Sequence, residues 1–262
     1  MSNVVSPLRY PGGKTRAVNK IALLLPEFSE YREPFLGGGS VFMYVKQNMD
    51  CNNYWINDVN QDLMAFWIEA QKNSHDLAEE IQNIKDDCDN YRDLFFEYKY
   101  KKASSSFEKA VKFFILNRLT FSGVVGFGGY SGKTGRFTDS SIDRIRPLSD
   151  VLQSTLITHF DYMDMLRYPG DNVFLFLDPP YYDASKSKLY GKNGRLHLDF
   201  DFEKFAMEAQ RCDHKWLITH SDTREIRDLF QFANIKEFDI VYGMDNVSRK
   251  PKRARELFIT NY

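Results

Sequence analysis

The apolar positions along the chain predict β-strands that alternate with α-helices. Residues 173–177, VFLFL, are continuously apolar and are followed by Asp178 and two prolines, which is typical of a central strand buried on both faces of a parallel sheet. Similar signals predict strands over residues 31–35, 54–58, 215–222, 235–243 and 255–262. Apolar side chains at helical spacing predict helices over residues 15–25, 40–47 and 223–232. Pro26 ends the first of these helices.

Residues 62–152 differ from the segments on either side. Helical periodicity runs through LMAFWIEAQ and FEKAVKFFILNRL, and a glycine-rich stretch, FSGVVGFGGYSGKTGRF, follows. We therefore expect a catalytic domain built from residues 1–61 and 153–262, into which residues 62–152 are inserted as a subdomain. Strands that alternate with helices around this insert predict a doubly wound α/β sheet, which binds ligands at the carboxyl ends of its strands.

The composition excludes several classes of protein. With 262 residues, 43% hydrophobic and 27% charged, the chain fits one large globular domain and not a disordered, collagenous or repeat protein. It shows neither the apolar core of a signal peptide nor the roughly 20 apolar residues that span a bilayer, so we expect a cytoplasmic protein with no membrane partner. The net charge of -1 does not indicate a nucleic-acid partner, so any polyanion site must come from local clustering.

The cysteines and histidines predict no metal site. The three cysteines are odd in number and far apart, and supply neither a disulfide framework nor a paired CxxC site: Cys51, Cys88 and Cys212. The five histidines show no HxxxH or HExxH spacing: His75, His159, His197, His214 and His220. We therefore expect the cysteines to be free, buried thiols and the histidines to be surface or core residues.

EPFLGGGS, residues 33–40, predicts a cofactor-binding turn. Three consecutive glycines stand where a strand turns into a helix, which lets the backbone approach a ligand closely and adopt positive φ. Asp58 ends the next strand, where nucleotide-binding folds place an acid on ribose hydroxyls. The alternative is a plain glycine turn and a helix-capping aspartate.

PGGKT, residues 11–15, is not a phosphate-binding P-loop. That motif requires glycine where Leu8 stands, and the strand that should precede it is missing. Two interpretations remain open. Tyr10 and Lys14 could lie over a cofactor pocket, where Lys14 offers an ammonium to a carboxylate, or the glycines could only turn the chain into the first helix.

LDPPYY, residues 177–182, carries the clearest chemistry. The exocyclic amine of a purine or pyrimidine is a poor nucleophile, because its lone pair is delocalised into the ring. Asp178 and the carbonyl of Pro179 can accept its two N–H groups and stabilise positive charge as it attacks a methyl group, while Tyr181 stacks on the base. The alternative is a proline-rich strand end.

In this order, RYPGGK, EPFLGGGSVF, WINDVNQDL and LDPPYY resemble motifs X, I, II and IV of the Dam-like, α-group DNA adenine-N6 methyltransferases. The resemblance covers nearly the whole chain. It implies a Rossmann-like methyltransferase sheet, mostly parallel with an antiparallel C-terminal strand, and an inserted target-recognition subdomain of helices and a β-hairpin. It also implies a site-specific enzyme that flips its target adenine out of the duplex and takes the methyl group directly from S-adenosyl-L-methionine, which requires no metal.

The resemblance assigns roles to residues at matching positions. The cofactor-binding positions are Tyr10, Lys14, Glu33, Phe35, Gly37, Gly39, Asp58, Asp161 and Tyr162. Tyr10 and Lys14 match positions that hold the methionine part of the cofactor, and Asp161 matches the acid that takes the adenine amine. Tyr162 replaces the family's phenylalanine. The catalytic positions are Asp178, Pro179, Pro180 and Tyr181.

Residues 117–137 resemble the end of the family's target-recognition helix and its hairpin. By this match Arg118 contacts phosphate, while Phe121 and Ser122 form the turn that enters the duplex beside the flipped base. The alternative for Phe121 is a core residue. Relatives that methylate GATC read guanine with an arginine where Gly126 stands here, so Lys133 and Arg136 become the candidate readers. We therefore expect a site other than GATC, or GATC read by a shifted arginine.

RKPKRAR, residues 249–255, is the densest basic run. In a DNA enzyme it predicts a phosphate clamp, with Arg249, Lys250, Lys252 and Arg253 as its contacts, although a solvated loop is the alternative.

Two other functions remain open: the same chemistry on RNA, and a catalytically silent DNA-binding protein. The expected partners are double-stranded DNA and a possible cognate restriction endonuclease. We expect a monomer or weak dimer, encoded by a bacterium or phage.

Overall fold

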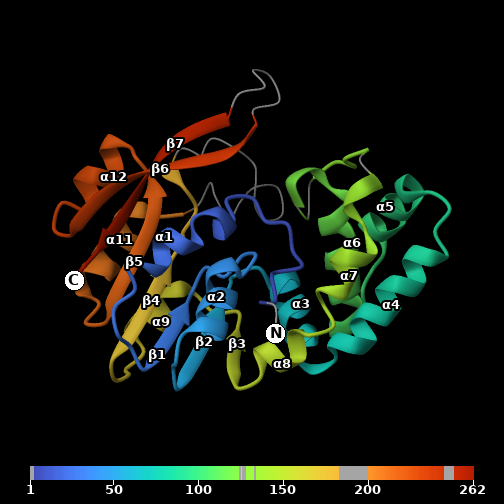
Figure 1. Ribbon diagram of the computed structural model, residues 1–262, viewed down its shortest axis with the longest axis horizontal. Helices are drawn as coiled ribbons and strands as arrows, with labels where there is room; N and C mark the ends of the chain where they lie inside the picture. Colours follow the sequence, from blue (N-terminus) through green and yellow to red (C-terminus); the bar gives the residue numbers. More distant parts are fainter. Residues whose placement is uncertain (1–2, 124, 126–127, 133, 183–199, 245–250) are drawn as a thin grey trace.

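The computed structural model describes residues 3–123, 125, 128–132, 134–182, 200–244 and 251–262 (Figure 1). Its centre is a seven-stranded sheet in the order β3-β2-β1-β4-β5-β7-β6. The strands are β1 (Glu30–Glu33), β2 (Asn53–Asn57), β3 (Thr155–Thr158), β4 (Val173–Leu177), β5 (Lys215–Ser221), β6 (Asn234–Met244) and β7 (Pro251–Thr260). Strands β1 to β5 are parallel, and β7 runs antiparallel between β5 and β6. The predicted α/β fold class, with its antiparallel C-terminal strand, is confirmed.

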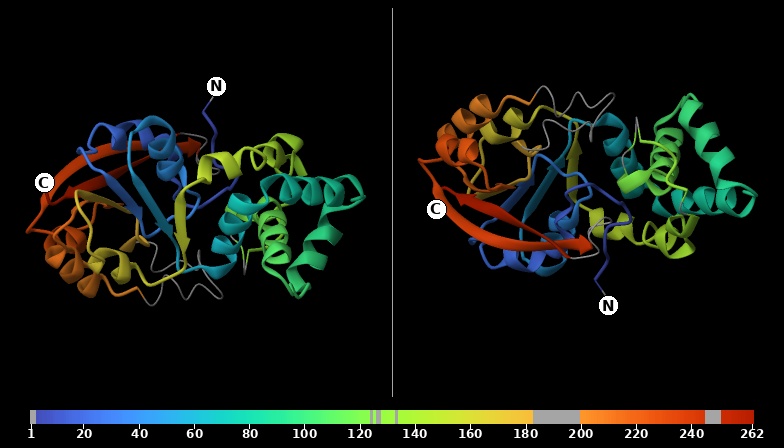
Figure 2. Two further views of the ribbon diagram at one scale, coloured as in Figure 1. Left: turned by 90° about the horizontal axis from the view of Figure 1, so that it is seen from below. Right: turned by 90° about the horizontal axis from the view of Figure 1, so that it is seen from above.

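Helices cover both faces of this sheet (Figure 2). On one face lie α1 (Val18–Ala22) and α2 (Ser40–Asn48), and on the other α9 (Tyr162–Arg167), α11 (Phe202–Arg211) and α12 (Arg224–Leu229). All five side chains of β4 are buried: Phe174 and Phe176 pack toward the first face, and Val173, Leu175 and Leu177 toward the second. Burial on both faces explains why this strand is continuously apolar.

The remaining helices form a bundle beside the sheet, with α4 to α7 grouped at one end of the molecule (Figure 1). They are α3 (Gln61–Lys72), α4 (Ser74–Asp86), α5 (Tyr91–Tyr100), α6 (Ser106–Leu119), α7 (Asp139–Asp143) and α8 (Leu148–Leu152). Phe66 of α3 stacks on Phe114 of α6 at a centroid distance of 5.8 Å, and both belong to the core that also contains Phe174 of the sheet. The division at residues 62 and 152 stays a prediction.

Two predicted elements differ from the structure. The helix expected over residues 15–25 is a 3-10 turn, Lys14–Arg16, followed by the short α1, and Leu23 beyond it is 86% exposed. Pro26 disfavours helical backbone at the residue before it, which shortens the helix. The hairpin implied after α6 is, among the described residues, one antiparallel bridge between Thr120 and Tyr130 with two 3-10 turns, Phe121–Gly123 and Thr134–Arg136.

No helix in the described part of the chain is long and apolar enough to cross a membrane.

Candidate active site

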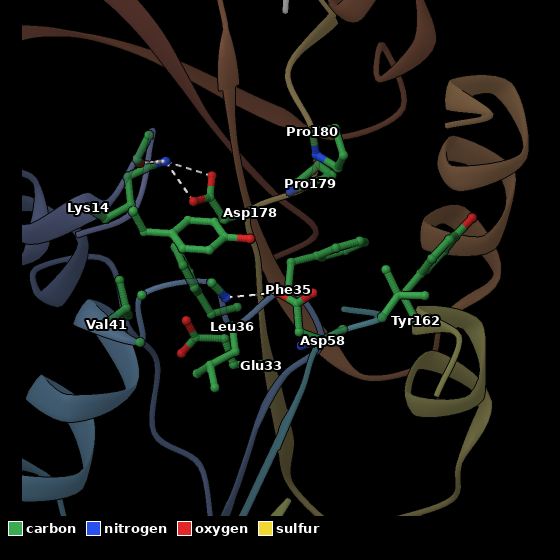
Figure 3. Close-up of a pocket in the computed structure, with 18 of the residues that line it drawn as sticks. Lys14, Glu33, Phe35, Leu36, Val41, Asp58, Tyr162, Asp178, Pro179 and Pro180 are labelled. Carbon is green, nitrogen blue, oxygen red and sulfur yellow. Dashed lines mark hydrogen bonds and ion pairs between the residues drawn. The ribbon is translucent and has the colours of Figure 1, made fainter. Parts of the chain in front are cut away.

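A cavity of about 690 Å³ lies at the carboxyl ends of β1, β2 and β4 (Figure 3). Its volume falls within the ~300–1,000 Å³ range of small-molecule sites. The structure brings to its walls every predicted cofactor residue: Tyr10, Lys14, Glu33, Phe35, Gly37, Gly39, Asp58, Asp161 and Tyr162. The predicted catalytic residues line the same cavity: Asp178, Pro179, Pro180 and Tyr181. Segments far apart in the sequence therefore meet at one edge of the sheet, while the role of each residue stays a prediction.

The glycine turn between β1 and α2 is shaped by its neighbours. Gly37 and Gly39 have φ angles of 48° and 66°, which side-chain-bearing residues rarely adopt. A Cβ atom on Gly37 would lie 2.8 Å from the ring of Tyr10, and one on Gly39 would lie 3.0 Å from Trp67. The glycines thus let Tyr10 lie directly over the turn and close this side of the cavity.

Asp58 joins the end of β2 to the glycine turn. One carboxylate oxygen accepts the Gly37 N–H and the other accepts the Asn60 N–H, both at 3.0 Å. Burial raises the pKa of Asp58 to about 6, although the two backbone hydrogen bonds oppose the rise. Two of the roughly four acceptor positions of the carboxylate are occupied, so two remain for a ligand.

An aromatic wall closes the far side of the cavity. The rings of Phe35 and Tyr162 lie 5.3 Å apart, and both pack against Phe205 of α11. Asp161 caps α9 by accepting the Met163 N–H at 2.9 Å, and its exposed side chain lies at the edge of the cavity. These apolar faces beside a carboxylate suit a planar heterocycle that carries an amine.

Asp178, at the end of β4, is held from two directions. The ammonium of Lys14 donates to it at 2.7 Å, across 164 residues of sequence, and also donates to the carbonyl of Gly12 at 2.8 Å. The ammonium is 2.7 Å from both carboxylate oxygens, and the hydroxyl of Thr219 on β5 donates to one of them at 2.7 Å. Lys14 is 4% exposed, so this ion pair is largely shielded from water. The predicted cofactor residue Lys14 thus contacts the predicted catalytic acid directly.

Two further buried carboxyl groups lie near the same ammonium. Glu33 accepts the hydroxyl of Tyr31 at 2.6 Å, and burial raises its pKa well above the usual range, with the charge of Asp178 adding to the rise. Burial also raises the pKa of Glu256 to about 6. Lys14 opposes both rises. The positive charge of Lys14 therefore stabilises the anionic form of a site rich in carboxyl groups.

Several polar residues that hold the site together were not predicted from the sequence. The side chain of Asn57 donates to the carbonyls of Pro34 and Phe160 and so ties three cavity loops to one another. Thr219, His220 and Glu256 support the LDPPYY turn from β5 and β7. Little in the local sequence distinguishes them, because Thr219 and His220 follow the apolar residues 216–218, and Glu256 lies between a basic run and the apolar residues 257–259.

Among the predicted DNA contacts, Arg118 and Arg136 are half-buried. The guanidinium of Arg118 donates to the carbonyls of Arg136 at 2.7 Å and Pro7 at 3.2 Å. Burial, together with the positive charges of Arg9, Arg144 and Arg136, lowers the pKa of Arg118 to about 10. Such clustering of cations favours an anionic partner.

Phe121 is 55% exposed in the turn after α6, so the alternative of a core residue does not hold. Asn117 fixes this turn: its side-chain amide donates to the carbonyls of Arg9 and Gly123 at 2.6 and 3.1 Å. Ser122 belongs to the same 3-10 turn by its backbone. Lys133, Gly126, Arg249 and Lys250 lie outside the described residues, and Lys252 and Arg253 are placed by their backbone in β7.

The described residues contain no group of three or more histidine, cysteine, aspartate or glutamate side chains that could hold a metal ion.

The parallel sheet with one antiparallel strand, and the acid-Pro-Pro-Tyr turn that lines a cavity at its carboxyl edge, define a Rossmann-like methyltransferase. The family model described as D12 class N6 adenine-specific DNA methyltransferase matches residues 10–244. The chain belongs to this family, and the protein is a site-specific DNA adenine-N6 methyltransferase.

Individual relatives are similar along most of the chain. The Type II methyltransferase M.MjaIII of Methanocaldococcus jannaschii is 24% identical over 97% of this chain and 98% of its own length. The DNA adenine methylase of Escherichia coli K12 is 24% identical over 95% of this chain and 92% of its own length. The DNA N-6-adenine-methyltransferase of Escherichia phage P1 is 28% identical over 88% of this chain, which spans 32% of that longer protein.

Proposed function

We propose that this methyltransferase uses S-adenosyl-L-methionine as methyl donor and acts on an adenine that is flipped out of double-stranded DNA. The observation that carries the proposal is the single cavity in which all predicted cofactor and catalytic residues meet. When bound, the cofactor supplies an electrophilic methyl group. The side chains of this chain bind the cofactor and the target base and orient them for the transfer.

The walls of the cavity fit such a cofactor by their chemistry. The free acceptor positions of Asp58 suit ribose hydroxyls, and Asp161 suits the amine of an adenine ring that packs against Phe35 and Tyr162. Tyr10 covers the glycine turn. Lys14 brings the ammonium that a ligand carboxylate requires, and its present bond to Asp178 links the cofactor side of the cavity to the catalytic side.

Catalysis is assigned to the turn after β4. Asp178 and the carbonyl of Pro179 accept the two N–H groups of the target amine, which favours a tetrahedral nitrogen and stabilises its developing positive charge. Thr219 and Lys14 hold the carboxylate of Asp178 in place before the base arrives. Tyr181 supplies the aromatic face on which the flipped base stacks.

DNA binding is assigned to the turn after α6 and to the hairpin of β6 and β7. Phe121 is exposed and supported by Asn117, as a side chain that enters a duplex beside a flipped base must be. Arg118 and Arg136 supply positive charge beneath it. Arg249, Lys250, Lys252 and Arg253 extend the phosphate contacts. The Type II name of M.MjaIII supports a cognate restriction endonuclease as part of this proposal.

The decisive experiment is modification-sensitive sequencing of DNA from cells that lack adenine methylation and express this chain. We expect N6-methyladenine at one short sequence in cells that express the wild type, and none in cells that express Asp178→Ala. In parallel, purified protein with labelled cofactor is offered duplex DNA and structured RNA. Transfer to RNA but not to DNA, or methylation on another base, would contradict the proposal.

A further inference from the structure

The ring of Tyr181 is held by groups that lie behind the cavity. The imidazole of His220 stacks on it at a centroid distance of 4.8 Å and an interplanar angle of 18°. The hydroxyl of Tyr181 donates to the carboxylate of Glu256 at 3.0 Å. Tyr181 lines the cavity, whereas His220 and Glu256 do not. One face of the ring is therefore backed by the imidazole, while the ammonium of Lys14 lies over the ring at 4.9 Å from its centroid, so a base that stacks on Tyr181 must share this ring with Lys14.

His220 also fixes the backbone of this turn. Its Nε2 atom accepts the N–H of Tyr182 at 3.1 Å, while Nδ1 lies 3.2 Å from the carbonyl of Ser221. The ring is thus the neutral tautomer that carries its proton on Nδ1. At 1% exposure, His220 has no room to turn away without breaking both contacts.

Glu256 is an unusual residue for its position. It lies on β7 opposite Ser221 of β5 and is 1% exposed. One carboxylate oxygen accepts the Tyr181 hydroxyl, and the other is buried with no hydrogen-bond partner. A buried and half-satisfied carboxyl group destabilises a fold, where an apolar side chain of similar size would not. The packing of the sheet alone gives no reason for an acid here.

We propose that Glu256 is a positioning residue for methyl transfer, which acts through the Tyr181 hydroxyl to fix the position of the ring on which the target adenine stacks. The hydrogen bond to Glu256 holds the hydroxyl end of the ring in place, while the stacked imidazole of His220 fixes its plane and prevents it from moving away from the cavity. Asp178 is three residues before Tyr181 on the same turn, so a fixed ring also fixes the base relative to the acid. This inference rests on the proposed stacking of the base on Tyr181.

The test is a double-mutant cycle between Tyr181→Phe and Glu256→Ala, read as the single-turnover rate on duplex DNA with saturating cofactor. Each single variant should lower the rate about tenfold, and the double variant should be no slower than the slower single variant. Glu256→Gln keeps an acceptor for the hydroxyl and should remain within about threefold of wild type. Cofactor affinity, measured by calorimetry, should be unchanged in all of them.

Thr260→Val is the matched control, because Thr260 lies on the same strand and its hydroxyl donates to the carbonyl of Tyr262, away from Tyr181. Its rate should equal that of wild type. Multiplicative effects in the double variant would overturn the proposal. So would a full rate in Tyr181→Phe, which tests the same hydrogen bond even if Glu256→Ala fails to fold. If the wild type itself transfers no methyl group, the proposed function fails. If the wild type is active but the two substitutions act independently, only the role of Glu256 fails.

Discussion

At the scale of the residue, Asp178 shows how the site is prepared. The ammonium of Lys14 lies 2.7 Å from both of its carboxylate oxygens, and the hydroxyl of Thr219 donates to one of them at 2.7 Å. A carboxylate has about four acceptor positions, so the target amine can be bound without the loss of either contact. The side chain therefore need not reorient when the base arrives, which is the condition for strong electrostatic stabilisation of a transition state.

Asp178→Ala should lower turnover by about two orders of magnitude or more, because the acceptor acts on charge that develops in the transition state. Cofactor affinity should remain nearly intact. The variant also leaves the buried ammonium of Lys14 without its carboxylate, so Asp178→Asn, which keeps the shape, is the matched control for folding. Steady-state rates and calorimetry provide the measurements. Turnover above about a tenth of wild type in Asp178→Ala would show that the assigned role is wrong.

Asp58 should act on cofactor binding rather than on the chemical step. Loss of its hydrogen bonds in Asp58→Ala should weaken cofactor binding by about 1–3 kcal/mol. Because burial raises the pKa of Asp58 to about 6, the wild-type affinity should be constant above pH 7 and weaken as the carboxylate is protonated below pH 6. Calorimetry across this range checks both effects. In Asp58→Asn the pH dependence of cofactor affinity should disappear. An unchanged cofactor dissociation constant in Asp58→Ala would show that Asp58 is not part of the cofactor site.

At the scale of the element, the turns to which we assign function are fixed by distant side chains. The turn after α6 is held by Asn117, which bonds Arg9 on one side and Gly123 on the other. A Cβ atom on Gly123 would lie 2.0 Å from the carbonyl oxygen of Arg9, so only glycine allows the N-terminal segment to pass here. The N-terminal motif and the insert are thereby joined into one surface.

Phe121→Ala should reduce base flipping, because an aromatic side chain that stacks in the vacated space offsets part of the unstacking cost. The measurement is the fluorescence rise of 2-aminopurine at the target position on binding. Arg136→Ala should relax the base preference at one flanking position, which methylation of a randomised duplex library would reveal. Phe96→Ala, a similarly exposed phenylalanine on α5, serves as a control. Wild-type flipping by Phe121→Ala together with full discrimination by Arg136→Ala would contradict this assignment.

The basic run RKPKRAR, residues 249–255, should contribute charge without sequence preference. Neutralisation of Arg249, Lys250, Lys252 and Arg253 should weaken binding to all duplexes about equally and reduce the slope of affinity against salt concentration. Titrations of cognate and unrelated duplexes at several salt concentrations measure both. Neutralisation of four exposed basic residues outside the run controls for the same change of net charge: Arg211, Lys215, Arg224 and Lys236. An unchanged salt slope would mean that the run is a solvated loop.

At the scale of the whole molecule, buried ionisable groups make stability depend on pH in opposite directions. Burial raises the pKa values of Asp58 and Glu256 to about 6, so these groups favour the folded state more as pH falls toward 4. Burial lowers the pKa of His220 from 6.5 to about 4, so the unfolded state takes up a proton first and the folded state loses stability over the same interval.

His220→Asn isolates the histidine contribution, because asparagine can still accept the N–H of Tyr182 and the two acids are common to both proteins. Relative to this variant, the wild type should lose about 2 kcal/mol of unfolding free energy between pH 7 and 4.5. Urea unfolding at the two pH values gives the difference. Parallel pH dependence in the two proteins would show that His220 is not buried in its neutral form.

The sequence by itself determined the fold class, six of the seven strands and many of the residues that line the cavity, but not β3 (Thr155–Thr158), a four-residue edge strand whose apolar run is only Leu156 and Ile157. Each of these depends on local properties: the continuous apolar run of β4, the glycines that a tight turn requires, and the acid and prolines at a strand end. Short loops that follow parallel strands meet at one edge of a sheet, so the site could be predicted without knowledge of the packing.

Only the tertiary structure decided how these residues are paired. The bond between Lys14 and Asp178 spans 164 residues, and that between Tyr181 and Glu256 spans 75. Such contacts depend on the order and register of the strands, because β7 must insert between β5 and β6 before Glu256 can reach the turn after β4. No pattern of neighbouring residues encodes that register. The buried groups that hold the catalytic turn were therefore invisible in the sequence, while the turn itself was not.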